Sequence, residues 1–188
     1  MTIIRNYNFD LTKVTAMLYD ESGFLWLAFA KNSDDVCILQ KVSAHNPSQI
    51  YYEIELSVDE IKALNILGTS LYVAVDDVTY LGYRYSRTSP LTVVTAISKP
   101  VGITEAPIAI ENDGTYVYFL LPGVTPDIKI LKYTTALVLN TTITLTGNNN
   151  ASSFVIDSLE NIWVVTYESP SKLIRVYDDG GYTFTVTL

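Results

Sequence analysis

The feature that most constrains this chain is an internal repeat. Four segments share one pattern, in which a polar residue precedes a tight turn and then an apolar stretch with a central aromatic residue. The aromatic residues recur at spacings of 46, 46 and 45 residues: Trp26, Tyr72, Tyr118 and Trp163. The polar residues recur independently at 45, 46 and 46 residues: Asp20, Asn65, Glu111 and Asp157. Two registers that hold at once indicate four equivalent structural units.

Each unit contains four short runs rich in Val, Ile, Thr, Tyr and Phe, separated by Gly, Pro, Asn and Asp. Residues 58–67 carry helix-forming types, but this segment is short and is followed at once by Gly68, so we expect a strand there. Four antiparallel strands in each repeat predict an all-β fold, a β-propeller with four blades of four antiparallel strands per chain.

We expect a single β-propeller domain over residues 1–188, with an extra N-terminal strand at 2–9 ahead of the first unit. The predicted blades cover about 13–57, 58–98, 104–146 and 151–188. The second strands of the blades read as apolar on both faces, as a sheet covered by neighbours on both sides requires. The third strands each carry one basic residue, for which regular spacing predicts a solvated structural position rather than a site: Lys41, Arg84, Lys132 and Arg175.

The best copies of the repeat are residues 19–30 and 156–165, with an Asp, a turn and a Leu-Trp-Leu or Ile-Trp-Val strand. This pattern resembles the degenerate repeat of two-component-regulator and NHL-type β-propellers. Glu160 and Asn161 replace the turn glycine in the fourth copy, and Tyr replaces Trp in the middle two. The resemblance implies a propeller used as a ligand-binding or interaction scaffold. It implies a structural role for the motif residues and transfers no catalytic residue.

Three modes of ring closure are compatible with four units. They could close as a small four-bladed ring, two chains could supply eight blades, or the chain could be one piece of a larger assembly. The strand at 2–9 could pair with the last blade or with a neighbouring subunit.

Charge and composition narrow the chemistry. The 188 residues have a formal net charge of −8 and no run of basic residues, so the chain is acidic and nucleic acid is a poor partner. Because the sequence has one His and one Cys, zinc sites built from His and Cys ligands and catalytic Cys-His pairs are excluded. The paired carboxylates fall at predicted turns, and we assign no catalytic residue, no metal ligand and no cofactor: Asp34-Asp35, Asp59-Glu60, Asp76-Asp77 and Asp178-Asp179.

No apolar run reaches the roughly 18 residues of a membrane span, so we expect no membrane insertion. The first residues also show no basic region followed by an apolar core, and we expect no secretory signal in this sequence. The compartment stays open, with a virion or a cell surface as options.

Tyrosine is the most informative residue type, because the 14 tyrosines can supply rigid amphipathic contact area. The candidate interaction surface consists of seven residues in the outer strands of the first two units: Tyr51, Tyr52, Tyr80, Tyr83, Arg84, Tyr85 and Arg87. Alternatively, these residues have a structural role and cover the edges of the blades.

The sequence therefore predicts a non-enzymatic module that binds a protein partner or assembles with itself. Few charges and many Thr, Tyr, Asn and Val residues are typical of structural proteins of virus or phage particles and of cell surfaces. A glycan-binding propeller lectin is the alternative. A propeller-fold lyase or glycosidase is a third possibility, for which no acid and base can be placed.

Overall fold

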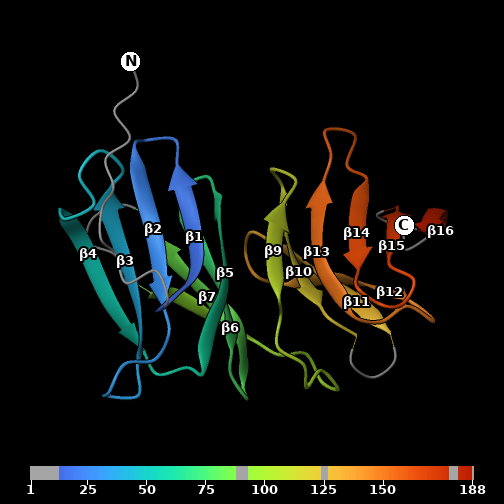
Figure 1. The fold of residues 1–188 in the computed structure, drawn as a ribbon, viewed down its shortest axis with the longest axis horizontal. Coiled ribbons are helices and arrows are strands. Elements are labelled where there is room, and N and C mark those ends of the chain that lie inside the picture. Colours follow the sequence, from blue (N-terminus) through green and yellow to red (C-terminus); the bar gives the residue numbers. More distant parts are fainter. Residues whose placement is uncertain (1–12, 88–92, 124–126, 178–181, 188) are drawn as a thin grey trace. The chain divides into compact units, whose positions relative to one another are not determined.

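A computed structural model describes residues 13–87, 93–123, 127–177 and 182–187 (Figure 1). The described elements form four sheets, and each sheet consists of four strands that follow one another in the chain and pair antiparallel. We refer to these sheets as blades 1 to 4. The prediction of an all-β chain with four blades of four strands is confirmed. The predicted strand at 2–9 lies outside the described residues.

The strands of blades 1 and 2 are β1 (Val14–Asp20), β2 (Phe24–Phe29), β3 (Cys37–Ser43), β4 (Ile50–Leu56), β5 (Glu60–Leu67), β6 (Ser70–Asp76), β7 (Tyr80–Ser86) and β8 (Val93–Ser98). Those of blades 3 and 4 are β9 (Ala109–Asn112), β10 (Tyr116–Leu121), β11 (Ile128–Thr134), β12 (Leu139–Leu145), β13 (Ala151–Ile156), β14 (Ile162–Thr166), β15 (Lys172–Val176) and β16 (Tyr182–Thr187). The segment with helix-forming residues is the strand β5, as expected.

The chain divides into two compact units, Met1–Ile61 and Lys62–Leu188. The first contains blade 1, and the second contains blades 2 to 4 apart from the first residues of β5. The single domain over 1–188 stays a prediction.

Short polar turns set the hairpins of the blades. Between β1 and β2, the Asp20 carbonyl accepts a hydrogen bond from the Gly23 N–H at 2.9 Å, and Asp20 Oδ1 accepts one from the Ser22 N–H at 2.8 Å. Gly23 has a φ of 86°, a left-handed conformation that glycine adopts without a steric penalty. The turn therefore requires both the Asp and the Gly of the repeat.

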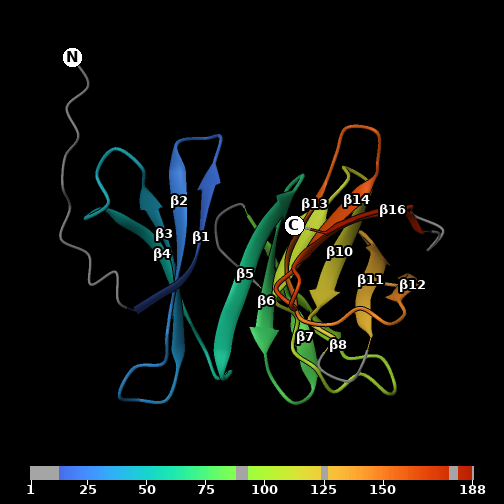
Figure 2. The ribbon, with the colours of Figure 1, turned by 45° about the vertical axis from the view of Figure 1, so that its right-hand side comes forward.

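Blade 3 shows how the blades of the second unit are held together, since both of its faces are buried. Val117, Phe119 and Leu121 on β10 belong to a cluster with residues of blade 2. Tyr118 and Leu120, which alternate with them, belong to a second cluster with residues of blade 4. In Figures 1 and 2, β13 lies beside β9 and β10. The second strands are apolar on both faces for this reason.

The pairing registers place the repeat residues equivalently. Each central aromatic residue on the second strand is opposite the basic residue on the third strand, in the pairs Trp26–Lys41, Tyr72–Arg84, Tyr118–Lys132 and Trp163–Arg175. The first strands place Leu18, Glu111 and Val155 opposite the aromatic residue in blades 1, 3 and 4. These registers give a structural alignment of the blades that does not depend on sequence spacing.

Candidate binding site

The basic residues of the third strands lie against the aromatic residues of the repeat. In blade 1, Lys41 is only 8% exposed, and its Nζ lies 4.2 Å from the ring centroid of Phe24 and 5.1 Å from that of Trp26. An ammonium over a ring face is stabilised by the ring quadrupole, more strongly when water is excluded. Lys41 is thus part of the blade interior.

The same arrangement recurs in the second unit. In blade 3, Lys132 is 5% exposed, and its Nζ lies 4.0 Å from the ring centroid of Tyr116. In blade 4, the guanidinium carbon of Arg175 lies 5.6 Å from the ring of Trp163. The prediction of a solvated position is therefore wrong for both buried lysines. Periodicity located these residues, but it could not reveal that an aromatic ring on the adjacent strand desolvates them.

The polar residue of the repeat organises blade 4. Asp157 Oδ1 accepts hydrogen bonds from the Leu159 and Asn161 N–H groups at 2.9 Å each, and Oδ2 accepts one from Trp163 Nε1 at 3.0 Å. The Trp163 bond, together with those from Asn161 and Leu159, holds the pKa of Asp157 well below its usual value. Asn161 Oδ1 then accepts from Arg175 Nη2 at 2.7 Å. Carboxylate, indole and guanidinium form one connected structural network.

Blade 3 contains an equivalent carboxylate, Asp113. Its Oδ2 accepts a hydrogen bond from the Tyr118 hydroxyl at 2.6 Å, and Oδ1 accepts from the Thr115 and Tyr116 N–H groups at 2.7 Å each. Burial raises the pKa of Asp113, but these hydrogen bonds outweigh it, and the pKa lies below the usual value.

The expectation that Glu111 is the turn residue of the third repeat is therefore corrected. Asp113 performs the role of Asp157 in blade 3, and Leu67 stands at this place in blade 2. Asp113 precedes its aromatic residue by five positions, whereas Asp157 precedes Trp163 by six. The turn of blade 3 is thus one residue shorter than that of blade 4, so counting along the sequence does not align the two turn carboxylates.

Glu111 and Asn65 instead join two blades of the second unit. Asn65 Nδ2 donates to Glu111 Oε2 and to the Ile110 carbonyl, both at 3.3 Å. The side-chain amide of Asn112 donates back to the side-chain oxygen of Asn65, and to the Ile66 carbonyl at 3.1 Å. Burial raises the pKa of Glu111, against a smaller opposing effect of the Asn65 hydrogen bond. These side chains tie β5 to β9.

The candidate tyrosine surface divides between the two units. In the first, Tyr51 is exposed on β4, and its ring makes an edge contact with Phe24 at 4.9 Å between centroids. Tyr52 is half-buried, with Lys41 Nζ 6.0 Å from its ring centroid. Tyr51 is thus the accessible residue of this pair.

In the second unit, β7 aligns three rings, with centroids 5.6 Å apart for Tyr80–Tyr83 and 6.2 Å for Tyr83–Tyr85. Tyr85 is buried, and desolvation raises its pKa far above the usual value. Arg84 donates through Nη1 to the Thr135 carbonyl of blade 3. Arg87 is half-buried at the end of the hairpin.

Tyr85 is therefore removed from the predicted surface, because its ring is packed inside the blade. Tyr80, Tyr83 and Arg87 stay partly accessible. Sequence periodicity cannot separate the inward and outward members of such a strand when the strand is covered on both faces.

A pocket of about 360 Å³ lies in the second unit. Ala106, Ile108 and Pro122 provide apolar lining, while charged and hydroxyl groups complete it: Lys62, Asp76, Thr104 and Glu105. Lys62 Nζ and Asp76 Oδ2 form an ion pair at 3.6 Å, with side chains partly exposed. The pocket thus combines an apolar lining with charges of both signs.

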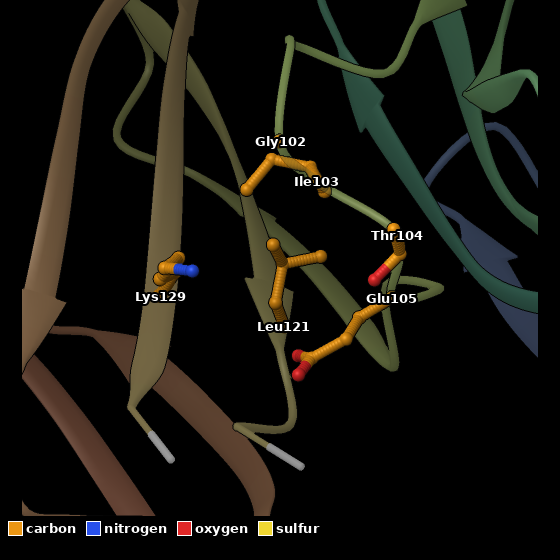
Figure 3. Close-up of a pocket in the computed structure, with 6 residues that line it drawn as sticks. All are labelled: Gly102, Ile103, Thr104, Glu105, Leu121 and Lys129. Atoms are coloured by element: carbon orange, nitrogen blue, oxygen red, sulfur yellow. The ribbon is translucent and has the colours of Figure 1, made fainter. Parts of the chain in front are cut away.

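The segment that leads into β9 has a fixed conformation at this pocket. Glu105 Oε2 accepts a hydrogen bond from the Gly123 N–H at 3.1 Å, and Lys99 Nζ donates to the Thr104 carbonyl at 3.1 Å. A smaller cavity of about 20 Å³, enough for one water molecule, adjoins it. Figure 3 shows the Leu121 side chain between Lys129 and Glu105, all of which line this cavity. The pocket wall is therefore pre-organised.

Sequence reasoning did not find this pocket. Its residues come from β5, from the end of β6, from the segment before β9 and from the end of β10, and each is an ordinary strand or loop residue in the sequence. Only the packing of blade 2 on blade 3 brings them together. Over the described ranges, no group of three or more His, Cys, Asp or Glu residues is placed to hold a metal ion. No helix in that part of the chain is long and apolar enough to cross a bilayer.

Comparisons with known proteins concern the fold. No family model and no curated protein matches the sequence. The structure is similar to the WD40 β-propeller domain of Doa1, with a TM-score of 0.69 and 10% identity, over 93% of this chain and 53% of that one. It is also similar to hydrazine synthase of Kuenenia stuttgartiensis, with a TM-score of 0.63 and 15% identity, over 87% of this chain and 53% of that one. The chain has a β-propeller fold and spans about half the length of these structures.

Proposed function

We propose that this chain is a non-enzymatic binding module whose partner binds at the pocket beside Lys62 and Glu105. The observation that carries the proposal is the pocket itself, about 360 Å³ in volume, which is within the range of small-ligand sites. The polar residues of the repeat, by contrast, make hydrogen bonds to nearby groups of the blades: Asn65 bonds to Glu111, and Asp157 bonds to Asn161 and Trp163. The pocket therefore exposes polar side chains and apolar surface side by side, where one bound group can contact both.

The chemistry of the lining favours a protein partner. Ala106, Ile108 and Pro122 would contact an aliphatic or aromatic side chain, and its burial would supply most of the affinity. Lys62 and Asp76 would orient polar or charged groups of the partner at the rim, adding more specificity than affinity. A short peptide segment with one apolar anchor next to charged residues matches this arrangement.

A role in a virus or phage particle, or in a cell-surface complex, is the setting that we propose for this module. It is supported by a composition rich in Thr, Tyr, Asn and Val. Immunogold labelling of particles and cells from the source tests it, and label confined to the cytoplasm would contradict it.

The experiment for the pocket starts from a random peptide library displayed on phage and selected on the immobilised protein. Peptides that bind should lose at least about tenfold in affinity, about 1.4 kcal/mol, when Ala106→Trp fills the pocket. Ala136→Trp adds the same side chain at an exposed turn of blade 3 and should change nothing. Peptides that bind both variants equally would place the site elsewhere, and no enrichment would contradict the proposal.

The glycan-binding alternative draws on the partly accessible tyrosines. It predicts binding of one sugar class on a glycan array, and loss of that binding in Tyr51→Ala or Tyr80→Ala but not in Ala106→Trp. An enzymatic function would require turnover that is lost on substituting single carboxylates such as Glu105.

A further inference from the structure

The pocket beside Lys62 and Glu105 has an excess of negative charge in its own lining. Among the described residues, one ammonium lines it, that of Lys62, against the two carboxylates of Asp76 and Glu105. Lys62 Nζ lies 3.6 Å from Asp76 Oδ2, and both side chains are partly exposed. A cation that enters the pocket would therefore balance the remaining carboxylate charge, whereas an anion would increase the excess.

Glu105 is oriented by the fold before any ligand binds. In Figure 3 its side chain extends from the segment before β9 toward Leu121 of β10. Its Oε2 accepts a hydrogen bond from the Gly123 N–H at 3.1 Å. The backbone around this donor is tightly packed, since a Cβ on Gly123 would lie 2.6 Å from the backbone nitrogen of Ile128. A carboxylate held in this way loses little conformational freedom when a ligand binds.

Two further lysines lie near this site without lining the pocket. Lys99 Nζ donates to the Thr104 carbonyl at 3.1 Å. Lys129 lines the smaller cavity, and Figure 3 shows the Leu121 side chain between Lys129 and Glu105. A ligand in the larger pocket therefore contacts its own lining first and meets these two ammonium groups only at longer range.

The apolar part of the lining selects the shape of the cation. Ala106, Ile108 and Pro122 share the pocket with the carboxylates. A small hydrated ion would leave this apolar surface in contact with water. Lysine and arginine side chains, in contrast, carry an aliphatic stem below a charged head, so the stem can cover the apolar surface while the head stays at the polar groups.

Building on the binding function proposed above, we propose that the partner is a protein segment that inserts a lysine or arginine side chain into this pocket. The aliphatic stem packs on Ala106, Ile108 and Pro122, and the cationic head lies at Asp76 and Glu105. The chain has a formal net charge of −8, which favours the approach of a basic segment. The apolar anchor of the partner and its charged group are thus two parts of one side chain.

The peptides selected on the immobilised protein separate this inference from the proposed function. Those whose binding is lost in Ala106→Trp are the pocket binders, and a lysine or arginine should recur at one position among them. Replacing that residue by methionine, which keeps an unbranched apolar stem, should weaken binding by at least about tenfold. Pocket binders that need no basic residue would overturn the inference and leave the binding site standing. A selection without pocket binders would overturn both.

Substitutions in the protein test where the cationic head lies. Glu105→Gln keeps an oxygen that can accept from the Gly123 N–H, and with Asp76→Asn it removes one charge at a time. Each should weaken binding of a basic pocket binder by at least about fivefold and reduce the dependence of its affinity on salt. Glu160→Gln, at an exposed turn of blade 4, is the matched control and should change neither. Circular dichroism checks that the variants fold. Unchanged affinity and salt dependence in both pocket variants would overturn the inference.

Removal of the cation in the lining gives a change of opposite sign. Lys62→Met keeps an unbranched stem and deletes the ammonium, so it should strengthen binding of the basic pocket binder by about twofold or more. Damage to the pocket would weaken binding instead. Fluorescence anisotropy with labelled peptide measures both directions. Weaker binding to a folded Lys62→Met variant would contradict the placement of a second cation beside Lys62.

Discussion

Truncation of Phe154 to alanine measures how much the packing between blades contributes to stability. The ring is 2% exposed and lies among aliphatic and aromatic side chains of blades 3 and 4. Most of these neighbours belong to the inner strands β10, β11, β14 and β15, whose backbones pair on both sides, so they can fill only part of the space that the ring vacates. The loss then includes both the transfer of the ring to water and the cavity that remains.

The expected cost of Phe154→Ala is about 3 to 5 kcal/mol in the free energy of unfolding, as for other buried phenylalanines. In a chain of this length, each kcal/mol shifts the melting temperature by about 2 to 4 °C, so a decrease of about 6 to 20 °C should follow. Leu159→Ala, at an exposed turn of the same blade, should stay within about 0.5 kcal/mol.

Urea unfolding followed by tryptophan fluorescence provides the assay. The sequence holds two tryptophans, Trp26 in the first compact unit and Trp163 in the second. In a Trp26→Phe background, all tryptophan emission comes from Trp163, so it reports the unfolding of the second unit, which contains Phe154. If Phe154→Ala cost no more than Leu159→Ala, the cluster between blades 3 and 4 would not be a stabilising core, and the reasoning about blade faces would fail with it.

Three further substitutions or reagents give sharp outcomes. Gly82→Ala should prevent folding or lower the free energy of unfolding by more than about 3 kcal/mol, because the added methyl group would lie 2.1 Å from the Val73 carbonyl oxygen. Thermal melting can detect this loss. The lowered pKa of Asp157 stabilises the folded state above about pH 4, and this stabilisation is lost as the pH falls below that value. Asp157→Asn should therefore make the free energy of unfolding depend less on pH in the acid range. Urea unfolding from pH 7 to pH 2 measures this dependence. Cys37, whose thiol pKa is raised by burial, should react with Ellman's reagent only on unfolding, and rapid reaction of the native protein would contradict its burial.

The fold was predictable because its signals are local and repeated. Short runs rich in Val, Ile, Thr, Tyr and Phe, the polar turn residues between them and the recurring aromatic residue indicate hairpins, and four copies of the same signal reinforce one another. The segment around β5 shows this, since the repeat outweighed its helix-forming residues. What the repeat could not supply was the length of each turn: the turn carboxylate precedes the aromatic residue by six positions in blade 4 and by five in blade 3, so a count from sequence spacing selected Glu111 in place of Asp113.

The candidate site was less predictable, because it depends on packing between blades. Lys62, Asp76 and Glu105 are separated widely in sequence, and no spacing rule relates them. The tyrosines of β7 were visible in the sequence, but whether a ring points into the blade interior or toward solvent depends on the neighbouring blade. Tyr85 was assigned to the surface because a period-two pattern gives no sign when both faces are covered.

The carboxylates of blades 3 and 4 that are hydrogen-bonded at the turns serve to order those turns. Asp157 is bonded to an indole and to backbone N–H groups, and Asp113 to a phenol and to backbone N–H groups. Each bond favours the charged carboxylate and fixes its orientation, which suits a turn anchor and opposes a proton donor near neutral pH. Glu111 has the opposite shift, but its carboxylate joins two blades through Asn65. These three acidic residues therefore have structural roles in blades 2 to 4.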